Sequence, residues 1–341
     1  MSPPSGRPTI EDVAAASNVS VATVSRALRG LPNVAAETRA RVRDAATALN
    51  YEVDPQASGL ATGKTMTIGL VAPLFGLWYA DQVVVGAESV VARDGYDLLV
   101  TSVRDVDSLD AFLQRVRGFG RRIDGALLID LFAGGDQLTR LAEIGVPAVS
   151  VGEDLGRWPS VTVDNEEAAA TATRHLLDAG HTRIGLIGGV QHNTLSSPVP
   201  ERRRRGWEAA LRSAGLRADP ALAVNGGFVV EGGAAGLATL LELDEPPTAV
   251  FCMSDRMALG ALNEARRRGL DVPGDLSIVG FDDDDIAESF GLSTMRQPVT
   301  TIGATAAELL LGMISGEAAT DEVVTLPVEL IVRASCGIAP R

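Results

Sequence analysis

The chain has 341 residues, of which 46% are hydrophobic, 22% are charged and 4% are aromatic. No run approaches the roughly 18 consecutive apolar residues of a membrane span, and residues 1–30 lack the apolar segment of a signal peptide, so we expect a cytoplasmic protein. Two cysteines, Cys252 and Cys336, suit a reducing compartment without a disulfide. The net charge of −14 would repel nucleic acid from most of the surface. Any nucleic-acid site must therefore be local and salt-dependent.

Residues 9–30 have the pattern of two short helices joined by a tight turn. Thr9 is a suitable N-cap, and Asp12 stands three residues later, where it can complete a capping box. Asn18 tolerates the left-handed backbone that a tight turn needs, and Ser20 can cap the second helix. The pattern predicts a helix-turn-helix, which is typical of DNA-binding heads. The alternative is a polar surface helix that contacts nothing.

The second helix is expected to bury Val24 and Leu28 and to present short polar side chains and arginines elsewhere. Arg26 can bind a guanine through two hydrogen bonds, which is worth about 1–3 kcal/mol of discrimination. A third helix is predicted over residues 36–49. Residues 20–43 contain five arginines and one acid, but residues 1–60 contain six of each, so weak non-specific binding is expected. The predicted DNA contacts from the head are Thr9, Ser20, Val21, Ala22, Thr23, Ser25, Arg26, Arg29 and Asn33.

Beyond residue 66, short apolar runs alternate with helical patterns of roughly 10–15 residues, which predicts βαβ units and parallel sheets. About 275 residues exceed what one core usually serves, so two similar lobes are expected. In such sheets, ligands bind outside the carboxyl ends of the strands. The predicted strands are Thr67–Ala72, Asp97–Thr101, Ala126–Ile129, Ala148–Val151, Ile184–Gly188, Ala249–Met253 and Leu276–Phe281.

The sequence resembles transcriptional regulators of the lactose-repressor family over nearly its whole length. The segments that carry the resemblance include Val19–Leu28, Leu49–Tyr51, Gly180–Ile184, Ser254–Gly260 and Val272–Asp283. The resemblance implies a small all-α helix-turn-helix head and an α/β two-lobed, periplasmic-binding-protein-like body with parallel sheets. It implies a tail at 1–8, a head at 9–53, a hinge at 54–65 and a body at 66–341, with an N-lobe of about 66–163 and 293–322 and a C-lobe of about 164–292 and 323–341.

The hinge follows the family pattern only in part. Ala57 and Leu60 match a helix whose leucines enter the DNA minor groove in the family, and both are predicted DNA contacts. Ser58 stands where the family usually has arginine, and Gly59 inside a helix costs about 1 kcal/mol relative to alanine. A helix that forms only on DNA and a flexible linker both stay open.

Candidate effector-binding residues follow the predicted strands of the body. Arg203 stands at the spacing of the family's effector-binding arginine, and its planar guanidinium can bind two neighbouring hydroxyls or a carboxylate. Asp282 can accept hydrogen bonds from sugar hydroxyls. Ser254, followed by Asp255, replaces an asparagine common in the family, so the identity of the ligand stays open. The predicted effector contacts are Trp78, Tyr79, Arg203, Phe228, Ser254, Asp255 and Asp282.

No catalytic set, cofactor motif or metal spacing is apparent. The run of acids at 282–285 cannot converge on one ion, and the three histidines lack zinc spacing. We therefore predict no enzyme, no cofactor and no membrane partner, but a ligand-controlled repressor whose affinity for a near-palindromic DNA operator is switched by a small sugar or related metabolite. A homodimer is expected because a single helix-turn-helix recognises few base pairs and two-fold dimers on near-palindromic sites are the usual arrangement. The resemblance implies a dimer or a tetramer, and the lack of appended leucine heptads favours the dimer. The alternatives are a sugar-binding protein without DNA function and an α/β enzyme.

Overall fold

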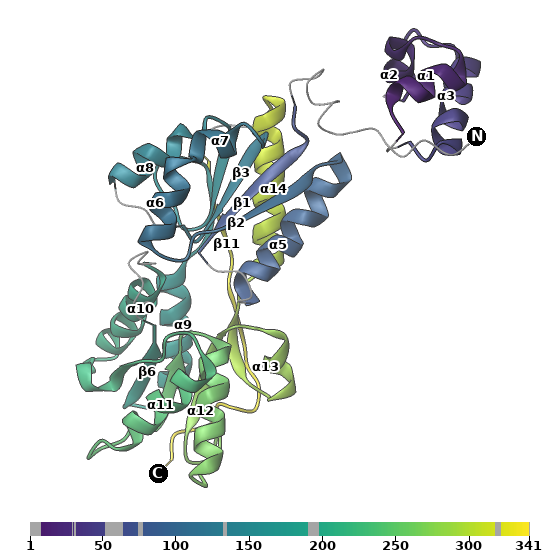
Figure 1. Cartoon of the computed structure of the whole chain (residues 1–341). Coiled ribbons are helices and arrows are strands. Elements are labelled where there is room, and N and C mark those ends of the chain that lie inside the picture. The colour runs from purple at the N-terminus through teal and green to yellow at the C-terminus, as the bar shows by residue number, and fades with distance from the viewer. Residues whose placement is uncertain are drawn as a thin grey trace. The chain divides into compact units, whose positions relative to one another are not determined.

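The computed structural model describes residues 8–28, 30, 32–51, 64–73, 78–131, 135–189, 198–317 and 322–340 (Figure 1). The chain divides into two compact units, Met1–Met66 and Thr67–Arg341, which we call the head and the body. The predicted tail except Pro8, the predicted hinge residues 54–63 with Ala57 and Leu60, and Arg29 lie outside the described residues.

The head consists of three helices, α1 (Ile10–Ser17), α2 (Val21–Leu28) and α3 (Ala36–Ala48). The predicted capping box is confirmed, since the side chains of Thr9 and Asp12 each accept a hydrogen bond from the other residue's backbone N–H. Asn18 has φ 53° and ψ 48°, which confirms the left-handed turn. The three helices meet at side chains that are fully buried: Val13, Val24, Ala27 and Val42.

The body contains two six-stranded sheets, one in each lobe. The N-lobe sheet has the order β11-β5-β4-β3-β1-β2, with strands β1 (Thr67–Ala72), β2 (Asp97–Ser102), β3 (Gly125–Ile129), β4 (Ala148–Gly152), β5 (Ser160–Val163) and β11 (Val323–Leu326). The C-lobe sheet has the order β12-β10-β9-β8-β6-β7, with strands β6 (Ile184–Gly188), β7 (Ala223–Asn225), β8 (Ala249–Cys252), β9 (Ser277–Asp282), β10 (Ser293–Arg296) and β12 (Glu329–Ile331). All the paired strands run parallel except β10 and β12.

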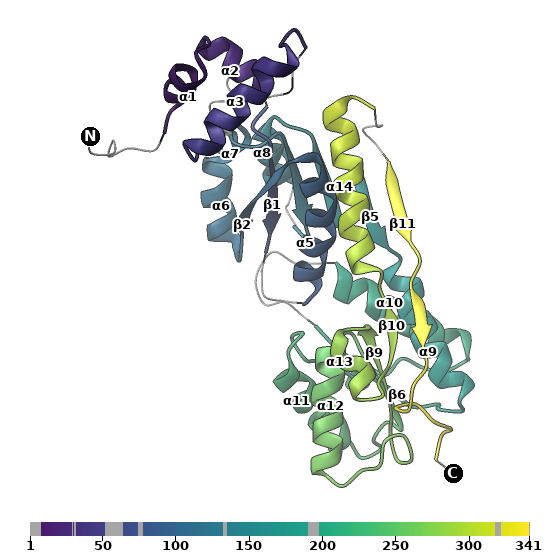
Figure 2. The ribbon, with the colours of Figure 1, turned by 90° about the vertical axis from the view of Figure 1, so that its right-hand side faces the viewer.

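Helices cover both faces of each sheet (Figures 1 and 2). The N-lobe helices are α5 (Trp78–Val91), α6 (Val106–Gln114), α7 (Val116–Gly120), α8 (Gly135–Leu141) and α14 (Val299–Ser315). The C-lobe helices are α9 (Asn165–Asp178), α10 (Val199–Ser213), α11 (Val230–Leu241), α12 (Asp255–Arg267) and α13 (Asp285–Ser289). Helices α5 and α14 lie side by side, and a methyl group added at Gly86 would come within 1.9 Å of the Thr300 carbonyl oxygen. That close approach is possible only because Gly86 has no side chain.

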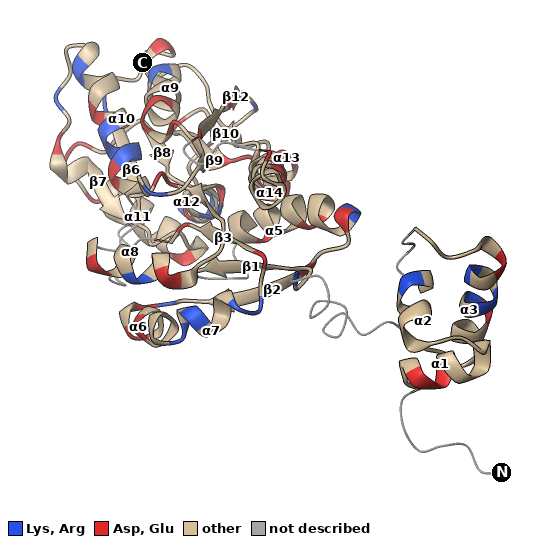
Figure 3. Cartoon of the chain, turned by 90° about the horizontal axis from the view of Figure 1, so that it is seen from above, with Lys and Arg blue, Asp and Glu red and all other residues tan. Residues whose placement is uncertain are grey.

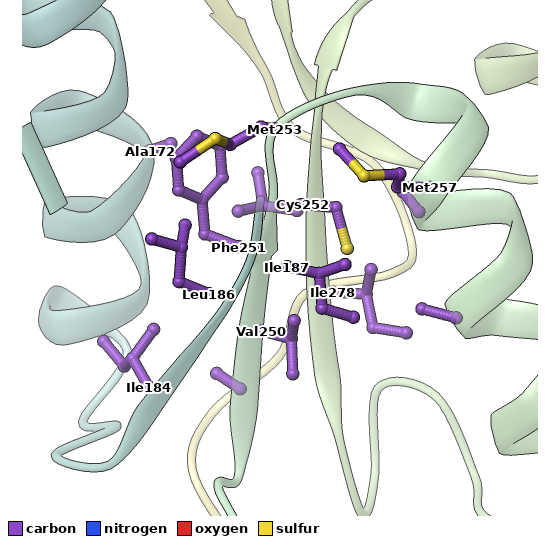
Figure 4. Packing of buried hydrophobic residues seen from close by; sticks show 14 of the residues in the cluster. Ala172, Ile184, Leu186, Ile187, Val250, Phe251, Cys252, Met253, Met257 and Ile278 are labelled. Atoms are coloured by element: carbon purple, nitrogen blue, oxygen red, sulfur yellow. The ribbon is translucent and has the colours of Figure 1, made fainter. Parts of the chain in front are cut away.

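The largest hydrophobic core belongs to the C-lobe. Its centre is the apolar strand β8, whose Val250, Phe251 and Cys252 are fully buried between the flanking helices (Figure 4). Strands buried on both faces are typical of parallel sheets. No helix within the described ranges is both long enough and apolar enough to cross a bilayer.

Two of the predicted lobe boundaries are wrong. Strand β10 was assigned to the N-lobe but pairs with β9 in the C-lobe sheet. Strand β11 was assigned to the C-lobe but pairs with β5 in the N-lobe sheet. Both crossings therefore lie a few residues farther along the chain than the resemblance implied, because strand pairing decides which sheet a short strand joins.

Candidate functional site

The outer face of α2 carries the predicted DNA contacts that the structure describes. Val21, with 40% of its surface exposed, and the exposed Ala22 and Arg26 point to solvent, while Thr23 and Ser25 are half-buried. The Ser20 hydroxyl oxygen accepts a hydrogen bond from the Thr23 backbone N–H at 3.2 Å, so Ser20 caps the helix as predicted. Thr9, the N-cap of α1, is exposed, and so is Asn33, which lies between α2 and α3.

Two of the head's arginines donate hydrogen bonds to backbone carbonyl oxygens within the head. Arg41 donates from Nε to the Ser17 carbonyl oxygen at 3.0 Å, and Arg39 donates from Nη1 to the Ala27 carbonyl oxygen at 3.5 Å. Two of the five arginines in residues 20–43 therefore also contact the backbone of the head itself.

A cleft between the two lobes of the body contains the predicted effector residues. It has about 820 Å³ of space, part of it open to solvent, which is within the range of small-molecule sites. Residues from both lobes line it: Trp78, Tyr79, Asp130, Gly152, Val163, Asn165, Val199, Arg203, Phe228, Ser254, Arg256, Asp282, Asp284 and Gln297. Six of the seven predicted effector contacts, all except Asp255, are in this set.

Arg203 is buried, and two of its nitrogens are held by the C-lobe. Nε donates to the Asn165 side-chain oxygen at 2.8 Å, and Nη1 donates to the Met253 carbonyl oxygen. The guanidinium carbon lies 3.5 Å from the centre of the Phe281 ring, which fixes the plane of the group. Burial lowers the pKa of Arg203 to about 10, which leaves it charged at neutral pH.

Asp282 is the last residue of β9 and lines the same cleft. Its Oδ1 accepts a hydrogen bond from Gln297 Nε2 at 2.7 Å. Burial raises its pKa to about 8, although the charge of Arg203 acts in the opposite direction. The described side chains of Arg203 and Asp282 form no ion pair with each other. Both therefore retain hydrogen-bonding capacity toward the cleft.

Asp130 is a cleft residue that the sequence interpretation missed. It follows β3 of the N-lobe, and its carboxylate forms no hydrogen bond with another described residue. Burial raises its pKa to about 7, and burial likewise raises the pKa of the neighbouring Tyr79 hydroxyl. The available signal was its position, directly after a buried strand of a parallel sheet, where ligand-binding residues are expected.

Asp255 does not line the cleft. Its Oδ1 accepts a hydrogen bond from the Thr294 hydroxyl at 2.6 Å, and its Oδ2 accepts one from the Asp284 backbone N–H at 2.9 Å. The fully buried Asp255 therefore ties α12 to β10 and to the loop after β9. A role in direct ligand contact, as predicted, is not supported by this geometry, because both carboxylate oxygens are already used.

Three residues that line the cleft have a strained backbone. Asp130, Phe228 and Asp282 have φ values of 43°, 60° and 126°, which residues other than glycine rarely adopt. Strained residues cost on the order of 1–3 kcal/mol each and cluster at binding sites, where the surrounding structure holds them. No group of three potential metal ligands occurs in the part of the chain that the structure describes.

An ion pair joins the lobes beside the cleft. Glu153, which follows β4 in the N-lobe, has its Oε2 2.8 Å from Nη2 of Arg202 on α10 in the C-lobe. Its second oxygen is buried and has no hydrogen-bond partner among the described residues. Burial raises the pKa of Glu153, and Arg202 opposes that effect.

Two family models match the chain, the bacterial regulatory proteins of the lacI family over residues 9–54 and a periplasmic binding protein-like domain over residues 173–336. The chain is 35% identical over 342 residues to the HTH-type transcriptional repressor CytR of Escherichia coli strain K12, covering 97% of each protein.

Solved structures match both units of the chain. The crystal structure of the lac repressor dimer bound to operator and the anti-inducer ONPF is 28% identical, covers 97% of this chain and 99% of that one, and has a TM-score of 0.87. The complex of the transcriptional regulator CelR with cellobiose is 31% identical, covers 96% of this chain and 100% of that one, and has a TM-score of 0.72. The chain therefore belongs to the lacI family and is a ligand-responsive, DNA-binding transcriptional regulator.

Proposed function

We propose that the chain acts as a homodimeric repressor, that α2 of each head enters the major groove of an operator, and that a sugar in the cleft changes operator affinity. The observation that carries the proposal is the relation of Arg203 to Asp282. Both line one cleft, each is held by other side chains, and neither neutralises the other in an ion pair. Such a pair offers donors and acceptors to the hydroxyls of one ligand.

The remaining lining supports a sugar as the ligand. Asp130 and Asp284 provide further acceptors, while Trp78 and Phe228 provide apolar walls for a ring. The Trp78 indole N–H is buried and meets no acceptor among the described residues, so a ligand oxygen would satisfy it. In the CelR structure the ligand is cellobiose, a sugar.

A ligand in this cleft would couple the two lobes. Asp130 and Tyr79 belong to the N-lobe, whereas Arg203 and Asp282 belong to the C-lobe, so one ligand can contact both. A ligand that binds one arrangement of the lobes better shifts the population toward that arrangement. Linkage requires that DNA change effector affinity by the same factor, typically 1–3 kcal/mol.

A homodimer is proposed on two grounds. The matching lac repressor is a dimer on its operator. In this chain, Val85 on α5 and Val100 on the edge strand β2 expose 54% and 48% of their surfaces, which provides apolar area for a partner subunit.

The test is fluorescence anisotropy of the full chain on DNA from its own upstream region at two salt concentrations, with and without a panel of monosaccharides and disaccharides. We expect specific, salt-sensitive binding that one sugar changes at least fivefold. Binding of a sugar without any DNA binding would instead favour the sugar-binding protein without DNA function. Specific DNA binding that no sugar in the panel affects would contradict the sugar assignment.

A further inference from the structure

Four exposed arginines surround α7 in the N-lobe, and we call them the arginine cluster: Arg115, Arg117, Arg121 and Arg122. No acidic residue stands between them in the sequence. The body as a whole has the opposite character, since residues 67–341 contain 23 arginines, no lysine and 38 acidic residues. In Figure 3, where arginines are blue on the ribbon, α7 carries blue segments.

Only one arginine of the cluster forms an ion pair with a described carboxylate. Arg117 pairs with Glu143 at 3.2 Å, but no described carboxylate forms an ion pair with Arg115, Arg121 or Arg122. By contrast, two exposed arginines near the start of α10 are compensated. Arg204 pairs with Glu201 and Glu208, and Arg205 pairs with Glu166, as the ion pairs of that helix show.

The cluster is firmly attached to the first strand of the body. Val116 and Phe119 of α7 are buried, and a methyl group added at Gly69 in β1 would come within 2.9 Å of the Phe119 ring. The Asp124 backbone N–H donates to the Thr67 carbonyl oxygen at 2.8 Å. The arginines therefore lie at the end of the N-lobe where β1 begins (Figure 1).

That end of the body is where the chain arrives from the head. The three-helix segment of the head is described as far as Tyr51, and β1 begins at Thr67. These two residues are only 16 positions apart. Sixteen residues span at most roughly 55 Å when fully extended. When the head holds DNA, the tether therefore keeps this end of the body within reach of the same duplex.

We propose that the arginine cluster binds backbone phosphates of the DNA that the heads hold. This inference rests on the proposed DNA-binding function. Exposed guanidinium groups with unused donors match phosphate oxygens in charge and geometry. The cluster adds affinity that does not depend on base sequence, which compensates for a head with equal numbers of arginines and acids in residues 1–60.

The experiment compares the full chain with the double variant Arg121→Gln/Arg122→Gln. A matched control, Arg212→Gln/Arg217→Gln, removes the same charge from exposed C-lobe positions that have no ion pair with a described residue. Affinity is measured by anisotropy over a salt series, on an operator duplex and on a mismatched operator duplex of the same length. Thermal unfolding of all three proteins verifies that the variants fold.

The arginine-cluster variant should bind every duplex more weakly, to the same extent for operator and mismatched operator. Its plot of log K against log salt should become less steep by about one unit for each lost phosphate contact. The control should match the wild type. An unchanged salt slope and affinity in the folded variant would overturn the inference. A wild type that binds no DNA at any salt concentration would instead overturn the proposed function itself.

Discussion

Glu153 and Arg202 join the two lobes of the body through a contact of 2.8 Å between Oε2 and Nη2. The glutamate is buried, whereas the arginine side chain is 37% exposed, so the pair is partly screened by solvent. The pair lies next to two cleft residues, Gly152 and Arg203, in the sequence. It therefore links the two lobes at the edge of the cleft that Gly152 and Arg203 line.

Breaking this pair should change effector binding. We expect Arg202→Gln to alter effector affinity about three- to tenfold, because the lobe arrangement loses a contact worth about 1 kcal/mol. Titration calorimetry with the effector measures the change. The control is Arg205→Gln, whose partner Glu166 belongs to the same lobe. Equal effects of the two variants would show that the pair between lobes has no special role.

Replacing Arg203 should remove effector binding without removing DNA binding. In Arg203→Lys the charge remains, but one ammonium group cannot reproduce the bonds to Asn165 and Met253 together with the stack on Phe281. We expect effector affinity to fall at least tenfold, with operator binding in the absence of effector retained. Arg204→Lys, on the exposed face of the same helix, is the control. Retained effector affinity in Arg203→Lys would exclude Arg203 as the anchor of the ligand.

Effector binding should release protons near neutral pH. The pKa values of Asp130 and Asp282 in the free cleft are raised by burial to about 7 and about 8. Since sugar hydroxyls donate to ionised carboxylates, ligand binding favours ionisation, and affinity should rise as pH rises from about 6 to about 8. Calorimetry in buffers of different ionisation enthalpy measures the released proton. Affinity independent of pH, with no proton released, would rule out the ionised forms of Asp130 and Asp282 as ligand acceptors.

The same raised pKa predicts a stability effect. The folded body binds a proton on Asp282 at pH values between the unfolded pKa of about 3.9 and the folded value of about 8, so its stability falls as pH rises through that range. Asp282→Asn removes this penalty and keeps an oxygen for Gln297. We expect Tm at pH 8 to rise by about 2–4 °C per 1 kcal/mol gained, while effector binding is lost. Asp154→Asn, at an exposed aspartate outside the cleft, should leave Tm unchanged.

Gly86→Ala tests the packing of α5 against α14. The new methyl group would meet the Thr300 carbonyl oxygen at 1.9 Å, which forces the helices apart at a cost of about 1–3 kcal/mol. Thermal unfolding should show a lower Tm for this variant. Gly135→Ala, where a methyl group meets nothing within 4 Å, is the control and should not lose stability. A Gly86→Ala variant as stable as the wild type would contradict the close crossing.

Local chemistry in the sequence determined much of this protein. The capping box of Thr9 and Asp12, the left-handed Asn18 and the apolar strand runs depend on residues close together in the chain, so their structures could be predicted. Arg203 and Asp282 were identified from the resemblance to the family, with Asp282 also placed directly after a predicted strand, and both line the cleft.

Only the tertiary structure showed that Asp130 lines the cleft and that Asp255 does not. Both follow a buried strand, but Asp255 meets Thr294 from a strand 39 positions away, which uses its carboxylate beneath the cleft. Asp130 meets no such partner among the described residues and lines the cleft instead. Likewise, β10 and β11 joined the opposite lobes from those predicted. Long-range pairing settles these points, because hydrogen-bond partners that are distant in the chain leave no trace in the local pattern of apolar and polar residues.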